Sequence, residues 1–238
     1  MATVTLHSED GDMAAYQAEP VGPARGAVVV VQEAFGVNAH IEDVARRFAG
    51  AGYRAIAPHL FHRTGDPELA YDDFETMLPH LQALDRTGLL SDLDATLDYL
   101  AAAGFSPSNT GAVGFCMGGT VTFLAAVQHA MGAAVTFYGG GVAQGRFGLP
   151  SLVELAPGLQ TPWLGLFGDQ DTGIPVEQVE SLRVAVSAAP VETEVVRYPD
   201  AGHGFHCDAR PAAYDAAAAA DGWRRTLDWF GRHLGSPG

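Results

Sequence analysis

Apolar runs along the chain alternate with segments of helical periodicity, after two short stretches in which apolar and polar residues alternate. The first two stretches, Val4 to Leu6 and Met13 to Gln17, flank Glu9-Asp-Gly-Asp, a turn signal that predicts a hairpin of edge strands. The run from Ala27 to Gln32 is continuous and rich in valine. Such a run is typical of a strand that is buried on both faces of a parallel sheet.

The rest of the chain continues this alternation. Further strands are expected at 54–57, 110–114, 133–138, 163–167 and 192–198, and helices at 40–51, 89–103, 120–130, 175–188 and 212–234. The pattern predicts a doubly wound, mostly parallel α/β sheet with helices on both faces. Segments 61–84 and 139–158 break the alternation after strand ends, where open α/β sheets bind ligands, so both are candidate pocket walls and the first is a candidate lid.

The helix expected at 89–103 carries a stripe of leucines. Leu90, Leu93, Leu97 and Leu100 recur at spacings of three and four residues, which predicts that they share one buried face. Ser91 or a nearby residue is a candidate N-cap.

Composition and charge narrow the class of protein. With 238 residues, 47% of them hydrophobic, and no repeat or linker, we expect one α/β domain over residues 1–238. A net charge of −15 without a basic cluster argues against nucleic-acid and membrane partners. The absence of a leader-like start or a long apolar run predicts a cytoplasmic protein. We also expect a monomer or a small homo-oligomer that acts on a small molecule.

The segment Gly114-Phe-Cys116-Met-Gly118 follows an expected strand and precedes an expected helix. In this G-x-C-x-G pattern a nucleophile sits on a strained strand-to-helix turn, whose flanking glycines avoid collisions with nearby backbone. The N-terminus of the helix favours a thiolate, and the N–H of Met117 points toward a developing oxyanion. A structural alternative is that Cys116 is an ordinary buried cysteine beside a tight turn.

A base and an acid follow in the expected order. His203 lies on a glycine-flanked loop after the last strand, which is where this fold places its catalytic histidine. Between Cys116 and His203, the strand that ends at Gly168 leads into Asp169 and Asp171. Asp171 lies deeper in the loop and is the better candidate to orient His203, whereas Asp169 is able to stabilise the turn itself.

These three motifs are joined by Gln32-Glu-Ala-Phe-Gly-Val-Asn38 after the first buried strand, and together they resemble the dienelactone hydrolase family over essentially the whole chain. The resemblance implies an α/β-hydrolase fold and a triad of Cys116, Asp171 and His203. It also implies that Glu33 holds the resting thiol and accepts its proton when substrate enters.

The same resemblance assigns the oxyanion hole and part of the pocket. It implies that the backbone N–H groups of Ala34 and Met117 bind the oxyanion. Phe35 and Tyr138 are implied to line the substrate pocket, although core packing is an equally good reading for Tyr138.

The chain departs from the family at the substrate's carboxylate. The family's two carboxylate-binding arginines have no match, since Tyr71-Asp-Asp-Phe-Glu and His206-Cys207-Asp208 stand in those regions. A neutral ester or lactone is therefore a candidate substrate, unless Arg63, Arg86 or Arg210 replaces the missing clamp.

The reaction predicted is hydrolysis of an ester or lactone through a thioester on Cys116, with no cofactor. No metal is expected, because the His206-Cys207 step lacks the spacing of metal ligands. Two alternatives stay open: a thiol redox or detoxifying protein that joins Cys116 to Cys207, and a non-catalytic binder on the same fold.

Overall fold

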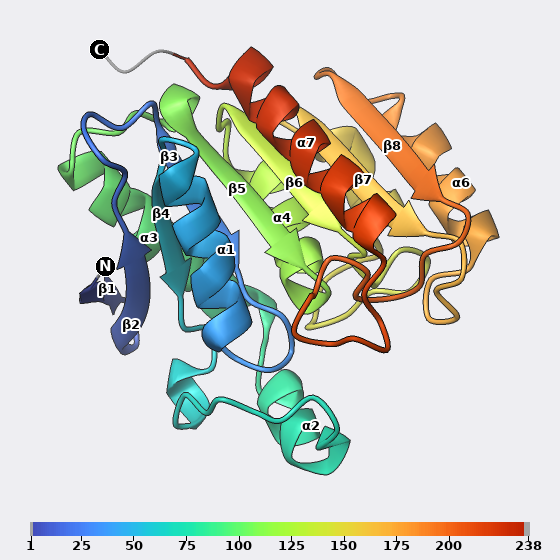
Figure 1. Cartoon of the computed structure of the whole chain (residues 1–238), viewed down its shortest axis with the longest axis horizontal. Helices are drawn as coiled ribbons and strands as arrows, with labels where there is room; N and C mark the ends of the chain where they lie inside the picture. The colour runs from blue at the N-terminus through green and yellow to red at the C-terminus, as the bar shows by residue number, and fades with distance from the viewer. Residues whose placement is uncertain (1, 236–238) are drawn as a thin grey trace.

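The computed structural model describes residues 2–235 and is built around one eight-stranded sheet with the order β1-β2-β4-β3-β5-β6-β7-β8 (Figure 1). The strands are β1 (Ala2–Ser8), β2 (Gly11–Ala18), β3 (Ala27–Val31), β4 (Arg54–Pro58), β5 (Thr110–Phe115), β6 (Ala133–Phe137), β7 (Trp163–Gly168) and β8 (Thr193–Tyr198). Every pair of neighbours from β4 to β8 is parallel, whereas β1 and β2 join the sheet antiparallel. The predicted mostly parallel sheet is confirmed.

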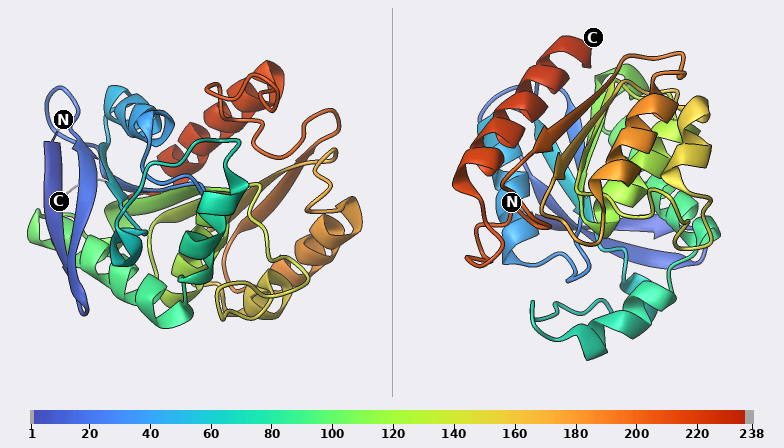
Figure 2. Two further views of the ribbon diagram at one scale, coloured as in Figure 1. Left: turned by 90° about the horizontal axis from the view of Figure 1, so that it is seen from below. Right: turned by 90° about the vertical axis from the view of Figure 1, so that its right-hand side faces the viewer.

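Helices cover both faces of the sheet. They are α1 (Ala39–Gly50), α2 (Phe74–Gln82), α3 (Arg86–Ala102), α4 (Met117–Gln128), α5 (Leu152–Leu155), α6 (Val176–Val186) and α7 (Ala216–His233), with short 3-10 turns at His62–Thr64, Pro107–Asn109 and Ala156–Gly158. Helices α1 and α7 lie on one face, and α3, α4 and α6 lie on the other (Figures 1 and 2). Because β3 is covered on both sides, Val28 and Val30 pack into one apolar cluster while Val29 and Val31 pack into another. This explains its continuous apolar sequence.

The hairpin is present, but only one of its strands is an edge. β1 forms one edge of the sheet, whereas β2 pairs with both β1 and β4. The prediction that both are edge strands is wrong for β2, because the parallel part of the sheet ends at β4 and leaves that edge open to an antiparallel partner.

Helix α3 begins earlier than predicted, and its buried face includes only Leu93 and Leu100 of the four predicted leucines. The carboxylate of Asp85, not Ser91, caps the helix by accepting the N–H of Gly88 at 2.8 Å. The buried residues are Leu89, Asp92, Leu93, Ala95, Thr96 and Leu100. Leu90 and Leu97 are only half-buried, because the buried stripe is centred one position away from the predicted one.

The segment 61–84 contains a helix that the apolar pattern did not reveal. Helix α2 begins after its N-cap Asp73 and contains Pro79. It has no buried residue, and it leaves Phe74 61% and Leu78 50% exposed. It projects from the body of the molecule near the carboxyl ends of the strands (Figure 2).

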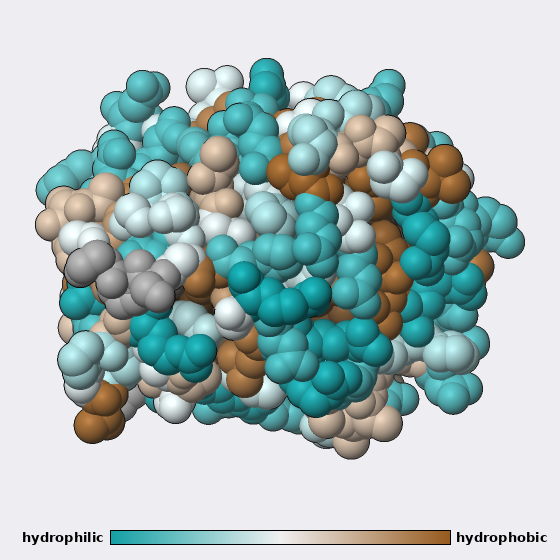
Figure 3. Space-filling view, turned by 90° about the horizontal axis from the view of Figure 1, so that it is seen from above, coloured by the Kyte–Doolittle hydropathy of each residue, from teal (hydrophilic) through white to brown (hydrophobic). Residues whose placement is uncertain are grey.

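The face on the opposite side, at the amino ends of the parallel strands, is mostly hydrophilic (Figure 3). Two pairs of adjacent arginines, Arg46-Arg47 in α1 and Arg224-Arg225 in α7, bind carboxylates: Arg47 contacts Asp43, and Arg225 contacts Asp221. No helix within residues 2–235 combines the length and the apolar character needed to cross a membrane.

Candidate active site

Cys116 occupies the sharp turn between β5 and α4. β5 ends at Phe115 and α4 begins at Met117, so Cys116 alone connects strand and helix. Its backbone angles are φ 55° and ψ −119°, a combination that residues with a side chain rarely adopt. The side chain is half-buried, so the thiol lies at the carboxyl end of a central strand and retains some access to solvent.

Two glycines make this turn sterically possible. A Cβ atom at Gly114 would lie 2.0 Å from the carbonyl oxygen of Gly118, and a Cβ atom at Gly118 would lie 2.4 Å from the carbonyl oxygens of Val31 and Gln32. Neither distance is tolerated between non-bonded heavy atoms, and both partners are backbone. The prediction that the flanking glycines avoid backbone collisions is confirmed, and β3, β5 and α4 meet closely at the turn.

Asp171 and His203 come together from the loops after β7 and β8. The Nδ1 atom of His203 lies 2.6 Å from Oδ2 of Asp171, and the other oxygen of Asp171 accepts the N–H of Gly173 at 2.8 Å. Asp169, the alternative partner, instead binds the guanidinium of Arg197 at 2.7 and 2.6 Å. Asp171 is therefore the carboxylate that contacts His203.

The surroundings of His203 favour its protonated form. Burial by itself lowers the pKa of His203, but interactions with Asp171 and with an ionised Cys116 outweigh burial and raise the pKa to about 10. With Cys116 ionised, His203 is thus an imidazolium at neutral pH, hydrogen-bonded to the Asp171 carboxylate and close to Cys116. A cation beside a cysteine stabilises the thiolate, which is the nucleophilic form.

Glu33 lies buried directly beyond β3. One carboxylate oxygen, Oε1, accepts a hydrogen bond of 3.2 Å from the hydroxyl of Tyr138, and the other, Oε2, has no partner among the described residues. Burial, followed by the charge of Glu33, raises the pKa of Tyr138 well above its ordinary value, so the hydroxyl is a donor. The Tyr138 ring lies 5.1 Å from the ring of His203, which joins Glu33 and His203 through one aromatic side chain.

Tyr138 itself is fully buried, with a positive φ of 40°. It packs against Phe115, Phe137 and Phe205. It therefore belongs to the core that supports the site, and only its contacts with Glu33 and His203 connect it to the polar groups.

Ala34 follows Glu33 beyond the end of β3, and Met117 follows Cys116 at the start of α4. Met117 is the first residue of α4, and the first N–H groups of a helix have no partner within it. Across residues 2–235, neither N–H donates to a backbone or side-chain acceptor in a turn or loop. Both amides are thus free for an acceptor on a ligand.

Phe35, Tyr71 and Arg210 form a stack beside these groups. The rings of Phe35 and Tyr71 meet edge to face at 4.8 Å, and the Arg210 guanidinium lies 5.4 and 5.3 Å from their centres. A Cβ atom at Gly204 would lie 2.9 Å from Nη1 of Arg210, so the guanidinium also contacts the loop that carries His203. Tyr71 comes from the segment 61–84, which therefore contributes to this wall.

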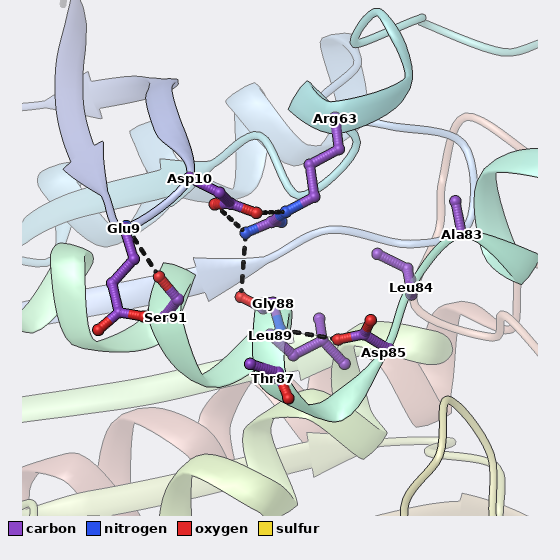
Figure 4. Close-up of a pocket in the computed structure, with 10 residues that line it drawn as sticks. All are labelled: Glu9, Asp10, Arg63, Ala83, Leu84, Asp85, Thr87, Gly88, Leu89 and Ser91. Atoms are coloured by element: carbon purple, nitrogen blue, oxygen red, sulfur yellow. Dashed lines mark hydrogen bonds and ion pairs between the residues drawn. The ribbon is translucent and has the colours of Figure 1, made fainter.

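Among residues 2–235, Arg210 forms no ion pair with a carboxylate. Arg63, by contrast, binds both Asp10 and Asp92. It lines a separate pocket of about 330 Å³ between the β1–β2 turn and α3, and Arg86 directly precedes Thr87 in the wall of that pocket (Figure 4). Apart from Arg63 itself, the residues labelled in Figure 4 include none of the candidate site residues, so this pocket is separate from the arrangement around Cys116.

The sequence motifs did not mark Tyr71 or His40 as site residues, and they offered Arg210 only as one of three alternative arginines. Tyr71 accepts a hydrogen bond from Asn38, and its hydroxyl lies 3.6 Å from the Cys207 sulfur. Cys207 is fully buried, and both cysteines are free thiols. These residues carry no local motif, and only their neighbours in space distinguish them.

Comparison with known proteins agrees with the motifs. The model of the dienelactone hydrolase family matches residues 13–234. A Salmonella typhimurium protein named "Putative carboxymethylenebutenolidase" is 43% identical to this chain, over 98% of this chain and 88% of the relative. The carboxymethylenebutenolidase of Pseudomonas putida is 30% identical, over 95% of this chain and 94% of the relative. The crystal structure described as a "Putative Dienelactone Hydrolase" from Klebsiella pneumoniae superposes with a TM-score of 0.89 at 38% identity, covering 97% of this chain and 98% of the other.

Proposed function

Since this chain belongs to the dienelactone hydrolase family, has the α/β-hydrolase fold and is a hydrolase of lactone or ester bonds, we propose that it cleaves its substrate through a covalent thioester on Cys116. The observation that carries this proposal is the hydrogen bond between His203 and Asp171, close to a half-buried Cys116 on a sharp strand-to-helix turn. A nucleophile, a histidine and a third side chain that orients the histidine play the same roles on several unrelated folds.

Acylation begins when the Cys116 sulfur attacks the substrate carbonyl. The proton of the Cys116 thiol passes to Glu33, whose Oε2 oxygen has no partner among residues 2–235, and the resulting thiolate favours the imidazolium form of His203. The N–H groups of Ala34 and Met117 bind the oxyanion of the tetrahedral intermediate. The carbon–oxygen bond of the ester or lactone then breaks, and His203, already an imidazolium, gives its proton to the leaving oxygen.

Deacylation restores the enzyme. Neutral His203, held by Asp171, takes a proton from water, and the hydroxide attacks the thioester carbonyl. The Cys116 thiolate leaves and recovers its proton from Glu33. The net change is one ester or lactone plus one water to a carboxylic acid and an alcohol, or to a hydroxy acid when a ring opens.

The test compares the two cysteines as a matched pair. Hydrolysis of a neutral aryl ester is measured for the wild type, Cys116→Ala and Cys207→Ser, and acyl-enzyme is trapped by acid quenching for mass spectrometry. We expect turnover to be lost only in Cys116→Ala and the acyl group to map to Cys116. Equal activity of Cys116→Ala, or an acyl group on another residue, refutes the mechanism.

The same measurements separate the other two readings of the site. Absence of turnover in the wild type favours a non-catalytic binder. Peroxide-dependent formation of a Cys116 to Cys207 disulfide, without ester turnover, favours the redox protein.

We further propose that Arg210 binds a carboxylate on the substrate. The name carboxymethylenebutenolidase, carried by the relatives, specifies a butenolide lactone with a carboxymethylene group. Arg210 has no carboxylate partner in the described chain, and it lies against Phe35 beside the loop of His203. A guanidinium is well suited to a carboxylate, because two parallel hydrogen bonds form.

Arg210→Met tests this assignment, because it retains the apolar stem that packs on the rings. We expect kcat/KM for a carboxylated dienelactone to fall about 10- to 100-fold, as for the loss of a hydrogen bond to a charged group, with a change of less than about threefold for a neutral aryl ester. An equal loss for both substrates refutes a role in carboxylate binding and indicates a structural role for Arg210.

A further inference from the structure

Three buried side chains from separate segments converge beside Tyr138. They are Glu33 after β3, His40 on the first turn of α1, and Cys207 on the loop before α7, and their exposed fractions are 1%, 3% and 0%. One potential ligand atom from each lies within 4.8 Å of the others. We propose that Glu33, His40 and Cys207 form a binding site for a divalent cation of the zinc type.

The first argument is that the polar atoms of this cluster lack partners. Oε2 of Glu33 and both ring nitrogens of His40 are buried without a hydrogen bond in the described chain. Buried polar atoms of proteins nearly always have a partner, and a buried carboxylate without a counter-charge is costly. No arginine within residues 2–235 forms an ion pair with Glu33. A bound cation supplies the missing partner for Oε2 of Glu33 and for one ring nitrogen of His40.

The second argument is the chemistry of the donors. Thiolate, imidazole and carboxylate are the three ligand types that zinc takes from proteins, and three of them leave one tetrahedral position for water. The thiolate of Cys207 and the carboxylate of Glu33 together neutralise the two positive charges, which favours binding in a buried site. Adjacent ligand atoms in a zinc tetrahedron are about 3.4–3.8 Å apart, so the observed cluster closes with shifts of about 1 Å. The Cys207 proton is released to solvent.

The third argument is the environment of His40. Oδ1 of Asp208 lies 3.3 Å from Nδ1 of His40, and Asp208 is itself held by Arg47. A carboxylate beside one nitrogen of a metal-binding histidine orients the ring and makes the other nitrogen a better ligand. Asp208 is in the place where such a carboxylate is needed.

A second cluster, formed by Asp10, His62 and Asp92, has carboxylates that already bind a positively charged side chain. Its ligand atoms also lie within 4.8 Å of one another. However, Arg63 donates hydrogen bonds to both carboxylates, at 2.8 and 2.7 Å. An arginine already supplies the positive charge there, so this cluster provides a control and not a second site.

A cation at the proposed site has a consequence for hydrolysis, and only this consequence rests on the proposed function. Binding occupies the Glu33 oxygen that takes the Cys116 proton in the proposed acylation. Zinc is therefore a reversible inhibitor, bound at a site that overlaps the catalytic machinery only through Glu33.

The binding test uses Zn²⁺ for stoichiometry, by equilibrium dialysis and elemental analysis, and Co²⁺ for spectroscopy. The variants are Cys207→Ser and His40→Gln at the site, Cys116→Ala at the other thiol, and His62→Gln as the control from the second cluster. We expect one zinc per chain in the wild type, Cys116→Ala and His62→Gln, and affinity reduced at least about 10-fold in Cys207→Ser and His40→Gln.

Cobalt identifies the sulfur that binds. A thiolate-to-cobalt charge-transfer band is expected to persist in Cys116→Ala and to be absent from Cys207→Ser. Unchanged zinc affinity in both Cys207→Ser and His40→Gln overturns the proposal. Loss of the cobalt band in Cys116→Ala also overturns it, because the ion then sits on the catalytic thiol. Circular dichroism establishes folding, and the two site variants change different elements, so either one decides if the other does not fold.

The inhibition test adds zinc to the wild type and to Cys207→Ser during hydrolysis of the neutral aryl ester, with EDTA to reverse it. We expect inhibition of the wild type at the zinc concentration that half-fills the site, and an inhibition constant at least about 10-fold higher for Cys207→Ser. Zinc that binds through Cys207 without slowing hydrolysis supports the metal site but refutes the role of Glu33 in acylation.

Discussion

The substitution Asp171→Asn should disable His203 while the protein stays folded. In the wild type, Oδ1 of Asp171 accepts the N–H of Gly173 at 2.8 Å while Oδ2 contacts Nδ1 of His203 at 2.6 Å. The asparagine oxygen is needed at Gly173, so its NH₂ group faces Nδ1 of His203. The imidazole then accepts at Nδ1 and keeps its proton on Nε2, the nitrogen left for Cys116, which is the wrong tautomer for a base.

The expected loss follows from two terms. A hydrogen bond to a charged group contributes about 1.5–3 kcal/mol, which corresponds to about 10- to 150-fold in rate. The wrong tautomer adds to this, and related triads lose up to about 10⁴-fold when the aspartate becomes asparagine. We therefore expect kcat/KM to fall about 10²- to 10⁴-fold. The pKa of His203 should also fall from about 10, because its hydrogen bond to Asp171 is one of the causes that raise it.

The assay is hydrolysis of a neutral aryl ester, with the rate of Cys116 alkylation by iodoacetamide as a second readout of the thiolate. Asp169→Asn is the matched control, since Asp169 lies in the same turn but binds Arg197. A loss of less than about threefold in Asp171→Asn would refute the assigned role. An equal loss in both variants would show that the turn, and not the contact with His203, matters.

Three further predictions concern stability. Gly118→Ala should lower the free energy of unfolding by about 1–3 kcal/mol or more, because the new Cβ would lie 2.4 Å from two carbonyl oxygens. The control Gly231→Ala should be neutral or stabilising, because its Cβ meets no atom within 4 Å. Equal midpoints of urea unfolding for the two variants would contradict this prediction. Asp92→Ala should cost about 3–5 kcal/mol in the same assay, because Asp92 is fully buried and pairs with Arg63; a cost below about 1 kcal/mol would show that water replaces it. The Arg63 guanidinium lowers the pKa of Asp10 to about 2 in the folded protein, so its contribution is present above the ordinary pKa of 3.8 and is lost as the pH falls toward 2. Acid titration followed by fluorescence should show a shallower loss of stability in Asp10→Asn than in the wild type, and identical titrations would exclude the pairing.

Features that depend on neighbours in sequence were predictable. The valine run of β3 forms a buried strand because two residues on each face meet a separate core. The glycines around Cys116 predict a strand-to-helix turn, because that turn brings Gly118 against the backbone of Val31. The loop order of Asp171 and His203 could be read from the alternation of strands and helices, since parallel strands bring their carboxyl ends to one edge.

Features that depend on distant partners were not predictable. Helix α2 has no buried residue, so no apolar stripe marks it, and its N-cap Asp73 is a single local signal. The buried face of α3 includes Asp92, a charged residue whose burial is possible only because Arg63 comes from another segment. From periodicity alone, the half-buried Leu90 was a better candidate for the core than Asp92 was.

The sequence by itself determined the α/β architecture, the family and the order of the candidate nucleophile, acid and base, because these are written in short-range periodicity and in motifs whose residues are adjacent. Only the tertiary structure decided that Asp169 binds Arg197, that Arg210 has no carboxylate partner among residues 2–235, and that Glu33, His40 and Cys207 converge. Partner choice of this kind depends on distances between segments that are far apart along the chain. Those distances are set by the packing of helices on the sheet, which no single stretch of sequence encodes.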